Sequence, residues 1–137
     1  MSLFLDTSGL LAILDRDDQY HAQANGAWQK ILSSPEELIS TNYVLVETFA
    51  LVQHRLGMEA VQTLQEDIIP VIEVEWVTQA IHQTAVGMLL KEDRRRLSLV
   101  DCVSFVVMHQ GNIRKVFAFD HHFEIAGYER YQVYGQK

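Results

Sequence analysis

The N-terminal stretch reads Leu3-Phe4-Leu5-Asp6-Thr7-Ser8-Gly9-Leu10-Leu11-Ala12. Its apolar start predicts a short buried strand over residues 3–6, and the residues that follow predict a brief helix over 7–14. A strand that ends in a carboxylate and leads into a helix is typical of α/β proteins, whose ligands gather outside the carboxyl ends of parallel strands. The stretch 116–120 also ends a run of apolar residues in a carboxylate, Asp120. These two stretches set the expected fold.

The rest of the chain alternates between strand-like and helix-like segments. Apolar runs predict further strands over residues 38–40, 70–75 and 131–134. One-sided apolar spacing, caps and breaks predict helices over 21–33, 43–56, 58–67, 76–91 and 98–110. Because 70–75 alternates apolar and acidic residues, we expect it near an edge of the sheet. The order predicts a single α/β domain, residues 1–137, around a mostly parallel sheet of about five strands.

The composition excludes several classes of protein. With 48% hydrophobic and 21% charged residues among 137, the chain is not expected to be disordered. A single cysteine, Cys102, excludes an intramolecular disulfide and a cysteine-based zinc cage. No stretch reaches the roughly 18–20 apolar residues that span a bilayer, and the first residues lack the basic region of a secretory signal. We therefore expect a cytoplasmic protein that does not contact membranes.

The charge balance limits how the chain could bind nucleic acid. Eleven Lys and Arg against 18 Asp and Glu give a net charge of −7. Proteins that grip nucleic acid by electrostatics alone neutralise phosphates with basic side chains. Any such function here would need a localised basic patch or bound cations.

Four carboxylates lie in unusually apolar surroundings. Asp6 and Asp120 end apolar strands, and Glu47 and Asp101 lie inside apolar helical segments. A buried ionised carboxylate without a partner costs several kcal/mol. No basic residue stands three or four positions from Glu47 or Asp101, so local ion pairs do not explain them.

Convergence at one edge of the sheet offers an explanation. Asp6 and Asp120 would meet at the carboxyl ends of their strands, and Glu47 and Asp101 lie about one turn into helices that could lean over the same edge. Four carboxylates would repel one another unless a cation lay between them, and all-oxygen ligation favours Mg²⁺ or Mn²⁺. Any one of these acids could instead be a helix cap or a semi-exposed residue; the set of four favours a site.

Four motifs in order resemble the PIN domain family. They are Leu5-Asp6-Thr7-Ser8-Gly9-Leu10-Leu11-Ala12, Thr41-Asn42-Tyr43-Val44-Leu45-Val46-Glu47-Thr48, Leu97-Ser98-Leu99-Val100-Asp101-Cys102-Val103-Ser104-Phe105, and Phe119-Asp120-His121-His122-Phe123 with Ala126-Gly127-Tyr128. The match covers the whole chain. The short length is similar to the VapC-type toxins of bacterial and archaeal toxin–antitoxin modules.

The resemblance implies a structure and an activity. It implies a three-layer α/β/α fold and cleavage of RNA that depends on Mg²⁺ or Mn²⁺, with one or two ions held by Asp6, Glu47, Asp101 and Asp120. It also implies frequent homodimers and, for the toxins, inhibition by a small antitoxin protein. The family's closing motif often carries another acid two residues after the position of Asp120, where this chain has His122.

Other polar residues beside the motifs have two interpretations each. Thr7 and Ser8 could place a hydroxyl near metal-bound water or substrate, or cap the helix that follows. For Asn42 and Ser98 the preferred interpretation is a helix cap, and Ser98 could also border the site. The run Arg94-Arg95-Arg96 is either solvated surface or an RNA-backbone contact that feeds the active edge.

Alternative functions stay open at this stage. A housekeeping RNA-processing nuclease would have the same carboxylates as a toxin. A non-catalytic binding module could keep the fold, although loss of activity should remove some of the four acids. Motifs of other enzyme classes, such as Gly-x-x-x-x-Gly-Lys, Gly-x-Gly-x-x-Gly and Gly-x-Ser-x-Gly, are absent from the sequence.

Overall fold

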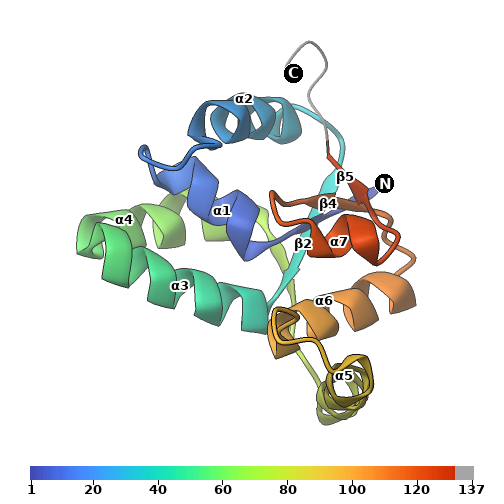
Figure 1. The fold of residues 1–137 in the computed structure, drawn as a ribbon. Helices are drawn as coiled ribbons and strands as arrows, with labels where there is room; N and C mark the ends of the chain where they lie inside the picture. The colour runs from blue at the N-terminus through green and yellow to red at the C-terminus, as the bar shows by residue number, and fades with distance from the viewer. Residues whose placement is uncertain (132–137) are drawn as a thin grey trace.

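The computed structural model of the protein describes residues 1–131, and a parallel β-sheet forms its centre (Figure 1). The strands are β1 (Ser2–Leu5), β2 (Glu37–Thr41), β3 (Glu73–Glu75), β4 (Lys115–Phe117) and β5 (Glu129–Arg130). They lie in the order β3-β2-β1-β4-β5, and every neighbouring pair runs parallel. The expected parallel sheet of five strands is confirmed, and β3 lies at an edge as predicted.

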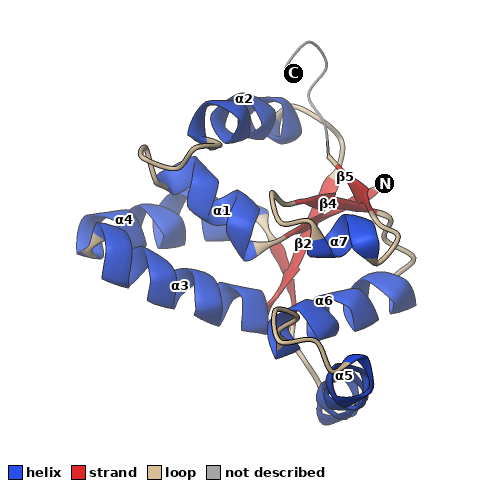
Figure 2. Cartoon of the chain, viewed as in Figure 1, coloured by secondary structure: helices blue, strands red, loops and turns tan. Residues whose placement is uncertain are grey.

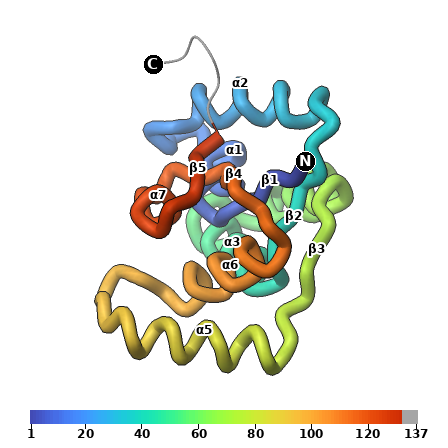
Figure 3. Tube along the Cα trace, turned by 90° about the vertical axis from the view of Figure 1, so that its right-hand side faces the viewer, coloured from blue at the N-terminus to red at the C-terminus, as the bar shows by residue number. Residues whose placement is uncertain are grey.

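Helices cover both faces of this sheet (Figure 2). They are α1 (Thr7–Leu14), α2 (His21–Leu32), α3 (Asn42–Leu56), α4 (Met58–Thr63), α5 (Gln79–Glu92), α6 (Leu99–Gln110) and α7 (His122–Ile125). Figure 3 shows α2 on one side of the sheet and α5 with α6 on the other. The three-layer α/β/α fold is therefore confirmed. Within residues 1–131, no helix is long and apolar enough to cross a membrane.

The central strand and the central helix are buried because their sequences are mostly apolar. Leu3, Phe4 and Leu5 of β1 are fully buried, as expected for a strand covered on both faces. In α6, every residue from Cys102 to Met108 is buried. These two elements hold Asp6 and Asp101 at their ends, so the core fixes the backbone from which both carboxylates project.

Gly9 brings α1 unusually close to β4. A Cβ atom at this position would lie 2.5 Å from the carbonyl oxygen of Phe117 and 2.7 Å from its ring. Only glycine allows this approach, because real Cβ atoms do not come so near to a backbone oxygen. The approach holds the start of α1, and with it Asp6, against the end of β4.

Several predicted boundaries differ from the structure around β3. The helix predicted over 58–67 ends at Thr63 and continues as a π-helical turn, Leu64–Ile68, and a 3₁₀ turn, Ile69–Val71. Pro70 lies in that 3₁₀ turn, so the strand predicted over 70–75 begins only at Glu73. The helix predicted over 76–91 begins at Gln79, because Thr78 caps it with a hydrogen bond from the backbone N–H of Ile81.

The end of the chain also differs from the prediction. The last strand was predicted over 131–134, but β5 is Glu129–Arg130, and residues 132–134 lie outside the described residues. Backbone hydrogen bonds from Glu129 to Arg114 and from Tyr131 to Val116 set its register beside β4. The short helix α7, which precedes it, was not predicted, because four residues are too few to show a helical period.

Candidate active site

Asp6 lies at the carboxyl end of β1 and caps α1. Its Oδ2 accepts hydrogen bonds from the backbone N–H of Ser8 at 3.2 Å and from the Ser8 hydroxyl at 2.8 Å. The side chain is almost entirely buried, with 5% of its surface exposed. No arginine or lysine forms an ion pair with it among the described residues. Asp6 is therefore both the helix cap of α1 and a buried carboxylate.

Asp101 lies in the first turn of α6 and forms a capping box with Ser98. The Ser98 hydroxyl accepts a hydrogen bond from the Asp101 N–H, and Asp101 Oδ2 accepts one from the Ser98 N–H, both at 3.1 Å. Such reciprocal bonds satisfy two backbone donors at a helix start. The preferred interpretation of Ser98 as a helix cap is confirmed.

Asp120 lies in the turn between β4 and α7. Its Oδ1 accepts a hydrogen bond from the backbone N–H of His122 at 2.8 Å, and the His122 ring nitrogen Nε2 lies 3.4 Å from the same oxygen. Asp120 therefore holds the start of α7 in place while its carboxylate remains partly exposed.

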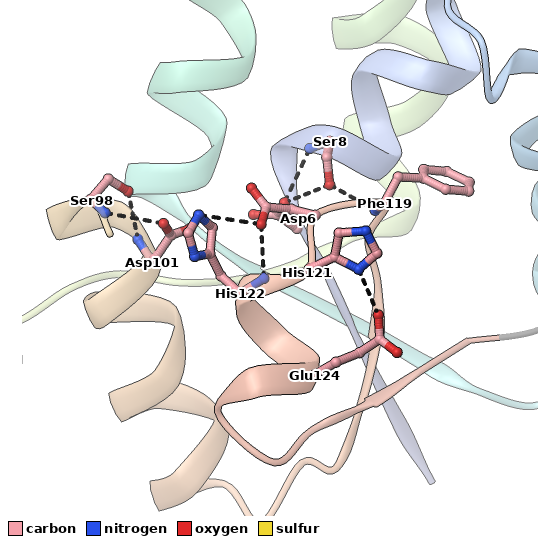
Figure 4. Close-up of polar contacts among 9 residues, drawn as sticks. Asp6, Ser8, Ser98, Asp101, Phe119, His121, His122 and Glu124 are labelled. Carbon is pink, nitrogen blue, oxygen red and sulfur yellow. Dashed lines mark hydrogen bonds and ion pairs between the residues drawn. The ribbon is translucent and has the colours of Figure 1, made fainter. Parts of the chain in front are cut away.

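Ser8 joins the two strand ends. Its hydroxyl donates to Asp6 and accepts a hydrogen bond from the backbone N–H of Phe119 at 3.0 Å (Figure 4). Asp120 follows Phe119 directly, so one side chain ties the loop after β4 to the carboxylate after β1. Ser8 takes part in the helix cap, because its N–H donates to Asp6, and its hydroxyl positions the same carboxylate. Its predicted place near metal-bound water or substrate stays a prediction.

The three aspartates act on one another electrostatically. Burial raises the pKa of Asp6 to about 7, the hydrogen bonds from Ser8 act in the opposite direction, and the charges of Asp101 and Asp120 add to the rise. Burial also raises the pKa of Asp101; the bonds from Ser98 and the charge of His122 oppose this rise, and the charge of Asp120 adds to it. The structure therefore brings these three predicted carboxylates within electrostatic reach.

Glu47 is less closely connected to this group. It lies in the second turn of α3 and is half-buried. Within residues 1–131 its carboxylate makes no hydrogen bond or ion pair with the three aspartates. Its membership of the site stays a prediction.

The group fits a divalent cation by charge and by ligand type. Its oxygens are acidic, partly or wholly buried and mutually repulsive, and the His122 Nδ1 atom is buried without a hydrogen-bond partner in the described residues. Carboxylate oxygens suit Mg²⁺ and Mn²⁺. In the described part of the chain, however, no three His, Cys, Asp or Glu side chains already form a group that could hold a metal ion. The charge and the ligand atoms of the group therefore suit a divalent cation, but the side chains are not already arranged around a metal position.

Two of the proposed supporting residues, Asn42 and Thr7, have structural contacts, and any role of theirs near the metal or substrate stays a prediction. Asn42 is not the cap of α3, because Thr41 accepts the capping bond from Val44; the Asn42 side chain accepts a bond from the Val77 N–H at 2.8 Å. It therefore holds the segment before α5. The hydroxyl of Thr7 is buried and lies 3.4 Å from the carbonyl oxygen of Val44 and 3.1 Å from the hydroxyl of Thr48.

Thr48 was missed by the sequence analysis. It is fully buried, and its hydroxyl donates to the carbonyl oxygen of Val44 at 2.7 Å. With Thr7 it forms a polar contact between α1 and α3, directly beneath the start of α1. Its position one residue after Glu47, inside an apolar helix, was the available signal.

The arginine run lies beside Asp120. A cavity of about 680 Å³ is lined by Arg94, Arg95, Arg96 and Leu97 from the α5–α6 loop and by Asp120, His121, His122 and Ile125. The only ion pair of the three arginines within residues 1–131 is a solvent-exposed one from Arg94 to Glu92 at 3.7 Å. The arginine run thus shares a cavity with Asp120, one of the four predicted carboxylates.

Comparisons with known proteins agree with this fold. Residues 3–127 match the PIN domain family. The 23S rRNA-specific endonuclease VapC20 of Mycobacterium tuberculosis is 35% identical over 127 residues, which are 92% of this chain and 95% of the relative. The crystal structure of that VapC20, described as a sarcin–ricin loop cleaving toxin, has a TM-score of 0.86 and 32% identity, covering 96% of this chain and 99% of the other.

Two more distant structures share the fold alone. FitAcB from Neisseria gonorrhoeae has a TM-score of 0.68 at 14% identity, covering 98% of this chain and 99% of the other. DNA-bound VapBC from Salmonella typhimurium has a TM-score of 0.64 at 15% identity, covering 96% and 97%. The family match over residues 3–127 and the 35% identity over most of the chain confirm the resemblance seen in the motifs. The chain belongs to the PIN domain family.

Proposed function

We propose that this chain is a ribonuclease toxin that cleaves 23S ribosomal RNA with the help of a divalent cation, Mg²⁺ or Mn²⁺. The observation that carries the proposal is the buried Asp6, whose pKa is raised to about 7 by burial and by two neighbouring aspartates, in a site with no lysine or arginine bound to it in residues 1–131. The activity class, an RNA-cleaving toxin, agrees with the names of the VapC20 relatives.

The carboxylates would hold the cation, either directly or through water. Asp6, Asp101 and Asp120 supply the oxygens, and Glu47 is the fourth proposed ligand. A bound divalent cation supplies a water of lowered pKa and stabilises negative charge on the phosphoryl oxygens. Ser8 keeps Asp6 and the Asp120 loop in fixed relation, so the oxygens are oriented before substrate arrives.

The arginine loop would bind the RNA backbone. Arg94, Arg95 and Arg96 line the cavity that also contains Asp120, so phosphates held by the guanidinium groups would lie next to the cation site. This arrangement supplies the local positive charge that a chain of net charge −7 otherwise lacks.

The proposal includes two protein partners. The distant matches FitAcB and VapBC, with VapC20, support a small antitoxin as a partner that inhibits the enzyme. A homodimer is proposed from the family resemblance. Co-purification with the product of an adjacent small gene would test the first, and light scattering of the purified chain would test the second.

Cleavage of ribosomal RNA is the direct test. Intact ribosomes and total RNA are incubated with wild type, Asp6→Asn and Asp67→Asn, in Mg²⁺, in Mn²⁺ and in EDTA, and the ends are mapped by primer extension. Asp67 is an exposed acid far from the site in sequence and serves as the matched control. We expect metal-dependent cleavage of 23S rRNA by wild type and Asp67→Asn only.

The alternatives give different results. Cleavage of other RNAs with 23S rRNA intact would leave a ribonuclease but overturn the rRNA substrate, as for a housekeeping enzyme. Equal cleavage by Asp6→Asn would overturn the assigned site. No cleavage and no metal binding by folded protein would support the non-catalytic binding module.

A further inference from the structure

Two aromatic rings stack on each other beside the end of β4. The ring centroids of Tyr20 and Phe119 lie 4.7 Å apart, and the two planes are 7° from parallel. Tyr20 comes from the turn between α1 and α2, and Phe119 comes from the loop that carries Asp120. Both residues are only partly buried, so part of this aromatic pair faces solvent.

The protein holds the aromatic pair in place from both sides. The ring of Phe117, which is buried, packs against Phe119 at 5.8 Å and 70°, and this contact connects the pair to the core. The backbone N–H of Tyr20 donates to Asp18 at 2.8 Å, and Nδ1 of His21 donates to a carbonyl oxygen of α1 at 2.8 Å. A ring that is fixed before binding loses little conformational entropy when a ligand stacks on it.

Phe119 is connected to the proposed cation site through its backbone. Its N–H donates to the Ser8 hydroxyl, which donates to Asp6, and the next residue in the chain is Asp120. Figure 4 shows the ring of Phe119 on one side of Asp6 and Asp101 on the other. The arginine run leads into α6, the helix of Asp101. An RNA strand that crosses the carboxylates from the arginine run would therefore reach the aromatic pair.

The charges around the aromatic pair favour contact with a base over contact with a phosphate. The turn before Tyr20 contains three aspartates and one arginine, Asp15, Arg16, Asp17 and Asp18. Such a turn repels the phosphates of RNA, whereas an aromatic ring can stack on any base, because every base has a π-face. Stacking on aromatic side chains is a common way for proteins to bind unpaired RNA bases.

We infer that Tyr20 and Phe119 form a stacking platform for one unpaired base of the RNA substrate, next to the bond that is cut. The inference rests on the proposed function, because it concerns the same RNA. It also narrows the substrate class to RNA with an unpaired nucleotide beside the cleaved bond, since the bases of a continuous duplex are stacked on one another. The arginine run would bind phosphates on one side of the carboxylates, and the aromatic pair would bind a base on the other.

The experiment measures RNA binding apart from RNA cleavage. The full-length Asp6→Asn protein, which we expect to be inactive, is the parent. It is titrated in Mg²⁺, at several salt concentrations, into fluorescently labelled oligouridylate and into the same strand with one central adenine. Adenine stacks more strongly than uracil, so the second strand reports on the stacking platform.

Four variants are made in this parent. Tyr20→Ala removes the ring, and Tyr20→Phe keeps it. Tyr20→Leu keeps an apolar cover over Phe119 but has no π-face, so it separates stacking on RNA from packing within the protein. Trp76→Ala is the matched control, because Trp76 is an aromatic residue with 71% of its surface exposed that follows the edge strand β3. Circular dichroism verifies that each variant is folded.

The ring of Tyr20 should determine the affinity for the adenine-containing strand. We expect Tyr20→Ala and Tyr20→Leu to bind this strand roughly five- to a hundredfold more weakly than the parent, and to lose its preference over oligouridylate. Tyr20→Phe and Trp76→Ala should bind like the parent. Because a stacked base releases no counterion, the slope of log affinity against log salt should stay unchanged in the Tyr20 variants.

Other results would overturn the inference. A folded Tyr20→Leu variant that binds as tightly as the parent shows that the ring only packs within the protein. A lowered salt slope in Tyr20→Ala shows that the change acts on phosphate contacts and not on a stacked base. Both results leave the ribonuclease in place. Failure of the folded parent to bind these strands or ribosomal RNA overturns the proposed function as well.

Discussion

The hydroxyl of Ser8 lies 2.8 Å from Oδ2 of Asp6 and donates a hydrogen bond to it, while the same hydroxyl accepts the backbone N–H of Phe119. One oxygen atom therefore couples the loops that follow β1 and β4. These loops are more than a hundred residues apart in the chain, and they carry two of the proposed ligands. This short side chain adds to the direct pairing of β1 with β4, in which the Asp6 N–H donates to the Phe117 carbonyl oxygen.

Replacing Ser8 by alanine should strongly reduce the rate of RNA cleavage while the protein stays folded. Asp6 and the Phe119 N–H would each lose a partner, at a cost of about 1–3 kcal/mol in the free energy of unfolding. Losing a residue that orients a metal ligand lowers activity roughly ten- to a hundredfold. Cleavage rates and urea unfolding measure both effects. Ser8→Thr keeps the hydroxyl and serves as the control; full activity of Ser8→Ala would contradict the positioning role.

The metal-free protein should be less stable at pH 8 than at pH 5. Asp6 has a pKa of about 7 when folded, against 3.8 as its ordinary value, so between these values the folded state binds a proton that the unfolded state releases. Stability therefore falls as the pH rises through this window and levels off above it. Over the whole window the loss is on the order of 4 kcal/mol for Asp6, of which about 3 kcal/mol falls between pH 5 and pH 8. Asp101 acts in the same direction.

Unfolding by urea in EDTA at several pH values measures this dependence. Asp6→Asn should flatten most of it, and Mn²⁺ should stabilise wild type more at pH 8 than at pH 5. Identical pH profiles for wild type and Asp6→Asn would show that the buried carboxylate is not the cause.

Two glycine substitutions should change stability in opposite directions. Gly9→Ala would place Cβ 2.5 Å from the Phe117 carbonyl oxygen and should destabilise the protein by about 1–3 kcal/mol. Gly87→Ala in α5 meets no atom within 4 Å and should stabilise it by about 0.5–1 kcal/mol, because alanine favours helix. Thermal unfolding compares the pair. Equal effects would show that the approach of α1 to β4 is looser than described.

Neutralising the arginine run should weaken RNA binding in a way that depends on salt. Arg95→Gln and Arg96→Gln should each lower the slope of log affinity against log salt by about one unit. Arg55→Gln, in the last turn of α3, is the control, because α3 begins at the carboxyl edge of the sheet and runs away from it. The arginine variants are made in the Asp6→Asn protein, which we expect to be inactive, so that the RNA is not cleaved during the titration. An unchanged slope in the Arg95 and Arg96 variants would assign the run to solvated surface.

The fold and the strand-end aspartates could be predicted because both depend on local pattern. Apolar runs of strand length end at Asp6 and near Asp120, and parallel strands bring their carboxyl ends to one edge. Asp101 could be predicted as a site residue because it is an acidic residue inside an apolar helical segment. The closeness of the three aspartates was thus visible in spacing and topology.

Other features depend on contacts between segments that are far apart in the chain, and the local sequence pattern could not predict them. The arginine run meets Asp120 only because the α5–α6 loop folds beside the β4–α7 turn. Asn42 stands where a cap is expected, yet its amide bonds to Val77, thirty-five residues later. The strand before α5 is shortened by a 3₁₀ turn at Pro70, which competes with the strand pattern of the same residues. Glu47 remains a prediction from the motif.

Each of the three aspartates also closes the start of a helix: Asp6 caps α1, Asp101 completes the capping box of α6, and Asp120 accepts the first N–H bond of α7. Loss of a carboxylate to a random substitution would therefore fray a helix as well as remove a charge. The cap is worth about 1 kcal/mol, so each of these positions contributes to stability as well as to the site. Asparagine can keep the cap through its amide oxygen while it removes the charge.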